Sequence, residues 1–546
     1  MISGSSLRAY TILTLLCALL YLPGLTSIPP TDRDEARFMQ ATKQMIETGD
    51  YINIHFQDEP RNKKPAGIHW LQSAAVKIAG QDLITYWPYR LPSVLAAWFA
   101  VLLCCAVGTR LFDRKTGFIA GLVLATSFMV VIEAHIAKTD AMLLAATTAA
   151  MGALAIMYNT LQGQRVGIGF ALLFWISLAV GTLVKGPVSL AVVIVTVVTL
   201  AITDKRIAWL KQTRPLLGFP LALALTLPWL LATSASEGGN NFIVEAVRGD
   251  LIPKLIGGQE SHGAPPGAHL AASLITAWPW SLLVPFVLVF GWRGRAVPVV
   301  RFCLAWLIGT WVLFEVVPTK LPHYTLPAFP ALALLIALAV QSESLHTLMQ
   351  TVSGRIYRGL WGLITLALGG GIIFASRTYG ADDLAAAGLT AAVLTASAAV
   401  ALVEWRSTRP LAFMAAAAVA FTALLSAGVI PRLNDLAVST RLAAAIAPYK
   451  IASGQPVAMA GYSEPSAVFL LGTDTILTST ASVVDYLLTH PGAVGVIEAA
   501  QVEEVTRAVA GTGGLRKLAD IEGYNYSRGD PVALSVVTIA PPEAQP

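Results

Sequence analysis

The stretch TDRDEARF, residues 31–38, holds three acidic and two basic side chains directly after an apolar run that ends near Ile28. A carboxylate in such a cluster can remove a proton from an attacking hydroxyl group or orient it. Acidic residues in the first turn of a helix are also favoured by the helix dipole, so capping alone is an alternative explanation. Arg33 and Arg37 make the cluster denser than capping requires.

Further ionisable residues stand beside other apolar segments of the chain. They are Arg61, Lys63 and Lys64 in RNKKP, Lys138 and Asp140 in KTD, Lys185 in KGP, and Lys320, His323 and Tyr324 in TKLPHYTLP. Ionisable groups at membrane spans are costly, which makes each a functional candidate. Each motif also has a plainer explanation, such as a headgroup-facing run, a helix start, a snorkelling lysine or a proline-rich turn.

The elements that must position these residues are apolar segments. Of the 546 residues, 55% are hydrophobic and 13% are charged, and the mean hydropathy is +0.65. Soluble proteins carry about 25% charged residues, and a membrane-spanning helix needs about 20 apolar residues. No alternating strand pattern appears, so we predict a polytopic α-helical membrane protein with about 13 spans. The expected spans are 7–28, 88–110, 117–134, 139–158, 167–184, 186–203, 215–235, 269–291, 298–317, 323–341, 358–376, 384–404 and 409–430.

The basic residues predict the orientation of these spans. With the N-terminus in the cytoplasm, Lys and Arg concentrate in the inner loops, as the positive-inside rule requires. Two long loops, residues 29–87 and 236–268, then lie on the outer face. The ionisable motifs all fall at outer loop ends, which predicts one polar cavity in the outer leaflet. Residues 7–28 could instead be a cleaved signal peptide, but they lack a clear A-x-A site.

The composition changes after Pro431. Short apolar strands (PVAMAG, DTILTS, GAVGVIEAA, ALSVVTIA) alternate with helical patterns, so residues 436–546 are predicted to be a soluble α/β domain outside the membrane. Residues 1–435 are then the transmembrane domain. Within its first outer loop, residues 34–47 and 65–79 are predicted helices that end at Gly49 and Gly80.

The residue types argue against a nucleic acid partner and a disulfide framework, and they leave a transporter and a lipid binder as alternatives. The basic residues form no single patch with interleaved aromatics, so a nucleic acid partner is not expected. The four cysteines lie in apolar spans without disulfide or metal-ligand spacing. A transporter would show internal repeats and charges at the membrane midplane, whereas these charges lie at outer ends. A polyprenyl-lipid binder or sensor is a further alternative.

The chemistry that suits the predicted cavity is group transfer from an anionic lipid. Lys, Arg and a Tyr hydroxyl can hold a phosphate leaving group and stabilise the charge it gains. Nucleotide-activated substrates are generally unavailable outside the cytoplasm. A donor carried on a lipid phosphate would meet this need.

Several motifs, taken in order, resemble the GT-C membrane glycosyltransferases. They are the Asp-Glu pair after the first span, KKPAGIHWLQ, TDAML, KGP, KLPHYTLPAFP and, in the tail, EGYNYSRGDPVALSVV. The resemblance is to the bacterial branch related to protein O-mannosyltransferases and to the lipid A 4-amino-4-deoxy-L-arabinose transferase, and it covers essentially the whole chain.

The resemblance implies roles for individual residues. Asp34, followed by Glu35, matches the catalytic acid of the first outer loop. The resemblance implies donor-phosphate or substrate-binding roles for Lys64, Asp140, Lys185, Arg248 and Tyr324. Arg61, Lys320 and His323 join these candidates because they stand at the same outer loop ends. The aminoarabinose transferases usually carry Glu before the KP lysine, where a metal has been inferred. Lys63 stands there in this chain, so no cofactor is assigned and a divalent metal is left open.

The resemblance also implies a reaction and a location. An inverting glycosyltransferase would move a sugar from undecaprenyl phosphate to a lipid A-type or other envelope acceptor. The active site and the tail would face the periplasm from the bacterial inner membrane. Protein O-mannosylation is the alternative reaction, and neither the sugar nor the acceptor follows from the motifs.

Overall fold

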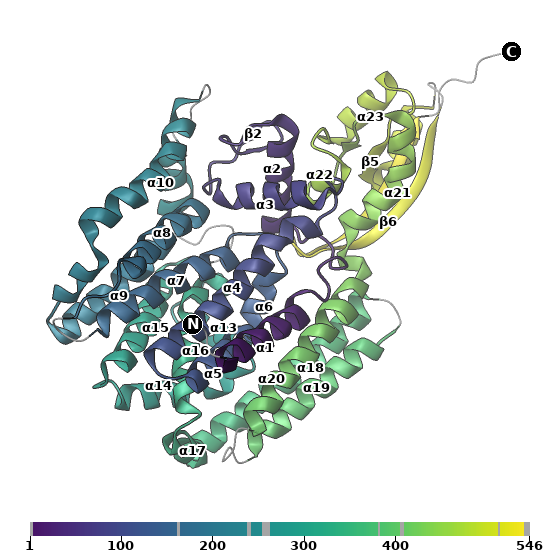
Figure 1. The fold of residues 1–546 in the computed structure, drawn as a ribbon. Helices are drawn as coiled ribbons and strands as arrows, with labels where there is room; N and C mark the ends of the chain where they lie inside the picture. Colours follow the sequence, from purple (N-terminus) through teal and green to yellow (C-terminus); the bar gives the residue numbers. More distant parts are fainter. Residues whose placement is uncertain are drawn as a thin grey trace.

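A computed structural model describes residues 4–160, 164–236, 242–253, 263–380, 383–403, 409–510 and 514–539. Long helices make up most of the molecule, and a smaller part that contains a β-sheet projects at one end (Figure 1). In the predicted loop 236–268, residues 237–241 and 254–262 lie outside the described residues.

Nine helices within the described ranges are long and apolar enough to cross a membrane. They are α4 (Trp87–Leu111), α7 (Asp140–Tyr158), α8 (Ile168–Lys185), α10 (Pro215–Ala235), α15 (Pro298–Val316), η4 with α16 (Pro322–Ala339), α18 (Val352–Tyr379), α19 (Ala385–Leu402) and α20 with η5 and η6 (Arg409–Arg432). The protein is therefore a multi-span membrane protein.

Four further apolar elements lie at the remaining expected spans. These are α1 (Gly4–Tyr21), the bent pair α5 (Arg114–Ala125) and α6 (Phe128–Ala134), α9 (Val188–Asp204), and η3 (Trp280–Leu283) with α14 (Val284–Arg293). Each expected span thus has a helical counterpart. The number of actual crossings stays a prediction.

Two of the expected spans are not continuous helices. Residues 117–134 form α5 and α6, which meet at an angle of 62°. At the break the hydroxyls of Thr126 and Ser127 donate back to carbonyls of α5, which competes with regular helix bonding. Residues 269–291 are interrupted between α13 (Ala268–Thr276) and α14, where Pro279 lacks a backbone N–H.

The first outer loop carries the helices that the sequence predicted. α2 (Asp34–Thr48) ends at Gly49 with φ 74°, and α3 (Gly67–Ala79) ends at Gly80 with φ 61°. Glycine adopts such positive φ values without steric cost. Between the helices lies a short antiparallel pair, β1 (His55–Phe56) and β2 (Glu59–Pro60). The predicted ends of both helices are confirmed.

The C-terminal part is built on a five-stranded sheet with the strand order β4-β3-β5-β7-β6. β3 pairs in parallel with β4 and β5, whereas β7 pairs antiparallel with β5 and β6. Its elements are α21 (Val438–Ser453), β3 (Ala458–Met459), α22 (Pro465–Leu471), β4 (Ile476–Leu477), α23 (Thr480–Thr489), β5 (Gly495–Glu498), η8 (Ala499–Gln501), α24 (Val502–Ala508), β6 (Leu515–Asn525) and β7 (Asp530–Ile539).

All four strands expected from the sequence are present, and β6 is an additional strand. The sequence did not predict it because its charged residues, such as Arg516 and Glu522, obscure the apolar alternation of a strand. β6 is an edge strand, where such charges are tolerated.

The remaining short helices connect these elements. They are η1 (Ala208–Thr213), α11 (Phe242–Glu245), η2 (Ala246–Leu251), α17 (Glu343–Gln350) and η7 (Asn434–Leu436). All four cysteines are buried and free, in line with their expected packing role.

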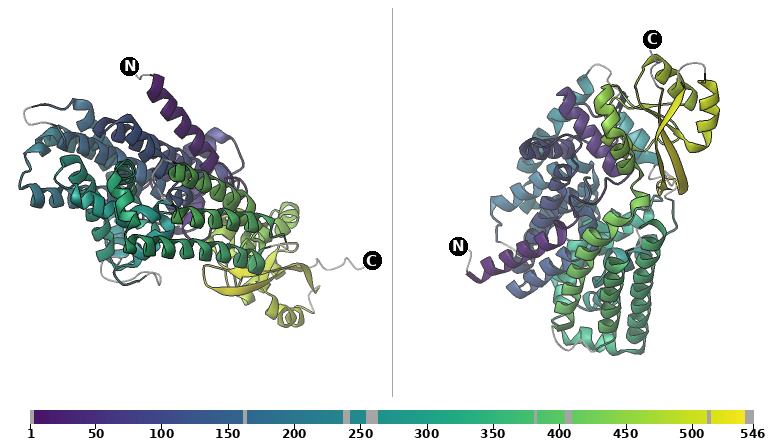
Figure 2. Two further views of the ribbon diagram at one scale, coloured as in Figure 1. Left: turned by 90° about the horizontal axis from the view of Figure 1, so that it is seen from below. Right: turned by 90° about the vertical axis from the view of Figure 1, so that its right-hand side faces the viewer.

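The elements that matter for the site gather at one end of the molecule. α2, α3 and α22 lie together above the membrane helices, next to the C-terminal sheet (Figure 1). α18, α19 and α20 lie side by side beneath that sheet (Figure 2). The first outer loop and the C-terminal part therefore cover the same end of the helix bundle.

Candidate active site

A cavity of about 680 Å³ lies between the first outer loop and the ends of the membrane helices. We call its wall from the first outer loop the roof; it includes Arg33, Asp34, Arg37, Arg61, Lys63 and Lys64. We call its opposite polar wall the floor; it includes Lys138, Asp140, Lys185, His323 and Tyr324. The expected polar cavity is thus present, with groups of both signs.

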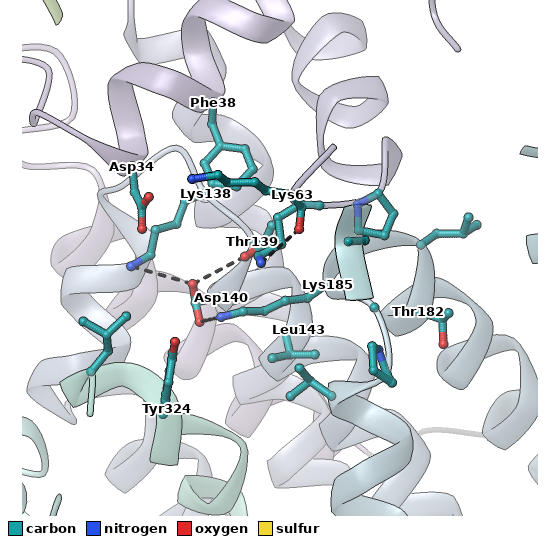
Figure 3. Close-up of a pocket in the computed structure, with 18 of the residues that line it drawn as sticks. Asp34, Phe38, Lys63, Lys138, Thr139, Asp140, Leu143, Thr182, Lys185 and Tyr324 are labelled. Atoms are coloured by element: carbon teal, nitrogen blue, oxygen red, sulfur yellow. Dashed lines mark hydrogen bonds and ion pairs between the residues drawn. The ribbon is translucent and has the colours of Figure 1, made fainter. Parts of the chain in front are cut away.

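Asp34 is the first residue of α2 and is exposed to the cavity. In the described chain no side chain hydrogen-bonds or ion-pairs with its carboxylate. Figure 3 shows Asp34 above Lys138 and Asp140. This carboxylate is therefore available to a bound substrate.

Glu35 points away from the cavity, which differs from its expected catalytic role. Its carboxylate lies 2.8 Å from the Arg90 guanidinium in α4, and both side chains are fully buried. It also accepts the backbone N–H groups of Thr31 and Ala137. Burial by itself would raise the pKa of Glu35, but the guanidinium and these N–H groups hold it below its usual value. Glu35 anchors the loop to the helix bundle.

The floor is organised around Asp140, which begins α7. Its carboxylate pairs with Lys185 at the end of α8, and the Lys138 amine lies 3.7 Å away. His323 Nε2 also lies 3.7 Å from it (Figure 3 shows Asp140 with both lysines). Asp140 is compensated by cations, so it holds the two lysines in the cavity and does not act as a free base.

Lys138 has a second buried partner, because its amine lies 3.0 Å from a carboxylate oxygen of Glu133 in α6. Burial alone would lower the pKa of Lys138, but Glu133 and Asp140 raise it above its usual value. The amine therefore stays protonated, as a phosphate-binding cation must.

Tyr324 and Arg61 also reach the cavity, one from each wall. The Lys185 amine lies 5.7 Å from the centre of the Tyr324 ring. The Arg61 guanidinium lies 5.4 Å from the centre of the Phe38 ring. Both arrangements orient a cation by its contact with an aromatic face.

Two expected substrate-binding residues do not line the cavity. The Lys320 amine donates to backbone carbonyls at the end of α15, including that of Glu315 at 2.8 Å. It therefore caps that helix. Arg248 is exposed on η2 and is not among the residues of the cavity wall.

Lys138, Arg33 and Arg37 line the cavity but are not among the substrate-binding residues expected above, although Lys138 was one of the ionisable candidates. Lys138 stands two residues before Asp140, and the two arginines flank Asp34. These three residues could have been chosen from the sequence because each stands within three positions of a residue that was chosen. Glu133 carries no such signal, because it lies inside an apolar segment.

The amino-acid sequence is similar to those of known sugar transferases. A model of the family dolichyl-phosphate-mannose-protein mannosyltransferase matches residues 63–231, a segment that contains Lys64, Asp140 and Lys185. The undecaprenyl phosphate-alpha-4-amino-4-deoxy-L-arabinose arabinosyl transferase of Aeromonas salmonicida is 29% identical over 365 residues, 65% of this chain and 64% of the relative. The enzyme of the same name from Pectobacterium carotovorum is 28% identical over 439 residues, 77% of this chain and 76% of the relative.

The fold is similar to that of ArnT over nearly the whole chain. The crystal structure of ArnT from Cupriavidus metallidurans bound to undecaprenyl phosphate matches with a TM-score of 0.72 and 17% identity, covering 99% of this chain and 100% of that one. The resemblance to the GT-C membrane glycosyltransferases is confirmed. An oligosaccharyltransferase from Archaeoglobus fulgidus matches more distantly, with a TM-score of 0.52 and 10% identity over 91% of this chain and 70% of that one.

The sequence match to the first of these relatives does not extend over its full length. The chain spans 64% of the Aeromonas salmonicida enzyme.

The residues of the site do not suit a divalent metal. Residue 63, where the resemblance implies a metal-binding glutamate, is a lysine in this chain. Asp140 is already paired with Lys185 and lies beside Lys138, and cations around a carboxylate oppose a metal ion. Within the described ranges, no three His, Cys, Asp or Glu side chains are grouped as ligands of one ion. We derive no catalytic step through a metal.

Proposed function

We propose that the protein is an inverting glycosyltransferase that moves a sugar from a polyprenyl-phosphate donor to an acceptor of the cell envelope. The observation that carries this proposal is the cavity itself. The carboxylate of Asp34, which no described side chain binds by a hydrogen bond or an ion pair, faces two lysines that suit a phosphate, Lys138 and Lys185. This is the charge arrangement that displacement of a phosphate leaving group requires.

The donor would bind with its phosphate on the floor and its lipid chain against the apolar part of the cavity. That part is formed by side chains of α7, α9, α10 and α15, among them Leu143, Val188, Leu230 and Leu313. Apolar surface of this kind holds a hydrocarbon chain. Undecaprenyl phosphate, the lipid named in the matched ArnT structure and in the names of the relatives, is the donor lipid that we propose.

In the proposed reaction an acceptor oxygen attacks the anomeric carbon as the bond to the donor phosphate breaks. The electron pair of that bond goes to the phosphate oxygen, whose added charge the Lys138 and Lys185 amines stabilise. Asp34 orients the acceptor, or takes its proton when the acceptor is a hydroxyl group. A phosphate acceptor, as in lipid A, is already ionised and needs no base.

Lipid A or a similar envelope lipid is our first choice of acceptor, because the curated relatives carry the aminoarabinose transferase name. Protein O-mannosylation remains the second candidate, supported by the mannosyltransferase family match over residues 63–231. In both cases we place the active site on the periplasmic face of the inner membrane, with thirteen crossings. The domains proposed are residues 1–435 in the membrane and residues 436–546 as a periplasmic α/β domain.

The proposal is tested by mass spectrometry of lipid A and envelope glycans from cells that carry the wild-type gene, a deletion or Asp34→Asn. Loss of one sugar mass in both altered strains is expected, and the molecule that loses it is the acceptor. An unchanged glycan profile, with the protein expressed and the donor lipid present, would refute the transferase proposal.

A further inference from the structure

The C-terminal part contacts the first outer loop at the two residues that precede Asp34. The Tyr526 hydroxyl accepts the backbone N–H of Asp32 at 2.6 Å. The Arg33 guanidinium donates to the backbone carbonyl of Ser527. Both contacts join residues 494 positions apart in sequence, so they depend on the tertiary fold.

The turn that supplies these contacts is held by its own hydrogen bonds. The side-chain oxygen of Asn525 accepts the backbone N–H of Ser527 at 3.0 Å, and the Tyr524 hydroxyl donates to the Gly529 carbonyl at 2.7 Å. The Asn525 amide also donates to Glu464, which precedes α22. The β6–β7 turn therefore presents Tyr526 and Ser527 in a fixed geometry.

The loop on the other side of the contact has an unusual backbone. Arg33 has φ 65° and ψ −99°, values that a residue other than glycine adopts only when its surroundings impose them. Its bond to Ser527 and the bond of the preceding N–H to Tyr526 are such constraints. α2 begins at the next residue, Asp34.

The same helix is attached to the C-terminal part along its length. Gln40 donates to the Thr473 hydroxyl at 2.8 Å, and the Lys43 amine donates to the Phe469 carbonyl at 3.1 Å. Thr473 in turn donates to Glu47 at 2.7 Å. The C-terminal part thus fixes both the start and the axis of α2.

We infer that Tyr526 and Arg33 are positioning residues, through which the β6–β7 turn sets the direction of the Asp34 carboxylate in the cavity. The inference rests on the proposed function, because it concerns the orientation of that catalytic group. No hydrogen bond or ion pair from a described side chain holds the Asp34 carboxylate, so the position of the first turn of α2 determines where this group can reach. A displacement of about 1 Å can lower a catalytic rate by about 100-fold.

The variant Tyr526→Phe tests this role, with Tyr524→Phe as the matched control. Each removes one hydroxyl from the same hairpin, but the Tyr524 hydroxyl bonds within the hairpin and not to the loop. We expect Tyr526→Phe to lower kcat about tenfold, with the KM for a polyprenyl-phosphate sugar unchanged within about twofold. Tyr524→Phe should keep kcat within about twofold.

Two further measurements separate positioning from a general loss of folding. Arg33→Lys keeps a donor for the Ser527 carbonyl, so its kcat should exceed that of Arg33→Ala. Hydrogen exchange of the peptide 31–37 in the full-length protein should quicken in Tyr526→Phe and not in Tyr524→Phe. A general loss of folding would instead quicken hydrogen exchange throughout the chain.

The outcomes also separate this inference from the proposed function. A normal kcat in Tyr526→Phe, with an active wild type and faster exchange at 31–37, would overturn the positioning role alone. An equal loss of kcat in Tyr524→Phe would overturn it as well. A wild type without any transfer activity would overturn the proposed function and this inference with it.

Discussion

Two aspartates of the cavity have opposite environments and so opposite uses. Asp140 is surrounded by Lys185, Lys138 and His323 at the end of the membrane helices. Asp34 faces the cavity from the loop and makes no hydrogen bond or ion pair with a described side chain. Carboxylates separated in this way take different roles, one structural and one chemical.

The lysine paired with Asp140 should bind the donor phosphate. Lys185→Met removes a charged hydrogen bond, worth about 1.5–3 kcal/mol, so the Kd for undecaprenyl phosphate should rise by at least about tenfold. Lys77→Met is the control, since Lys77 lies over the Tyr51 ring outside the cavity. Tryptophan fluorescence titration measures both. Equal affinity in Lys185→Met and wild type would contradict the floor as the phosphate site.

Glu35 should affect stability because its ion pair with Arg90 is fully buried. Glu35→Gln leaves the guanidinium without its counter-charge, which costs about 3 kcal/mol. The exposed Glu59→Gln on the same loop is the control and should change stability by less than about 0.5 kcal/mol. Thermal unfolding in detergent compares the two. A Glu35→Gln protein as stable as the control would show that the pair does not anchor the loop.

The sequence correctly predicted which side chains lie together where these side chains stand at the ends of adjacent helices. Lys138, Asp140 and Lys185 stand at the ends of adjacent helices, so the loop-end pattern brought them together correctly. Glu35 was misplaced because its partner Arg90 comes 55 residues later and only the fold joins them. Lys320 was misplaced because no sequence pattern distinguishes a cation in a cavity from one that caps a helix.

Among the elements, α2 links the cavity to the C-terminal part. Its helical span and its glycine end could be predicted from the sequence, because both depend on local preferences. Its docking on α22 could not, since Lys43 and Phe469 are 426 positions apart. The bend between α5 and α6 was also missed, because apolar residues on both sides hide it.

The contact of α2 with the C-terminal part should depend on pH through Asp32. Burial raises the pKa of Asp32 to about 6, and the negative charge of Glu464 raises it as well. The hydrogen bond from Ser466 and the positive charge of Arg37 lower this pKa but do not cancel the effect of burial. The hydroxyl of Tyr526 also lies beside Asp32, because it accepts the backbone N–H of that residue. The folded state then holds a proton that the unfolded state releases near its usual pKa of about 3.9, so stability falls as pH rises from about 4 to about 6.

Asp32→Asn removes this dependence while its side-chain oxygen still accepts from Ser466. Its melting temperature should match that of wild type near pH 4 and exceed it by a few degrees near pH 8. Asp58→Asn, an exposed acid of the same loop, is the control. A constant difference between Asp32→Asn and wild type across this range would contradict the assignment.

For the whole molecule, the proposed orientation places the C-terminal part outside the membrane. The four native cysteines are buried, so added cysteines can be labelled selectively. Ile451→Cys on α21, where the side chain is 84% exposed, should react with a membrane-impermeant maleimide in spheroplasts. Lys211→Cys, in the loop predicted to be cytoplasmic, should react only after lysis. The reverse pattern would contradict the periplasmic placement.

Asp34 is the group proposed to act on the acceptor, and a single-turnover assay measures this role separately from binding. Purified wild type and Asp34→Asn are mixed with a radiolabelled polyprenyl-phosphate sugar and the acceptor identified in cells. We predict that Asp34→Asn binds the donor with wild-type affinity and transfers its sugar to a hydroxyl acceptor at least about 100-fold more slowly. With a phosphate acceptor, which needs no base, the slower transfer would come from the lost orientation of the acceptor. The sugar should be joined with inverted anomeric configuration. Transfer at the wild-type rate by Asp34→Asn, or retention of configuration, would contradict the account.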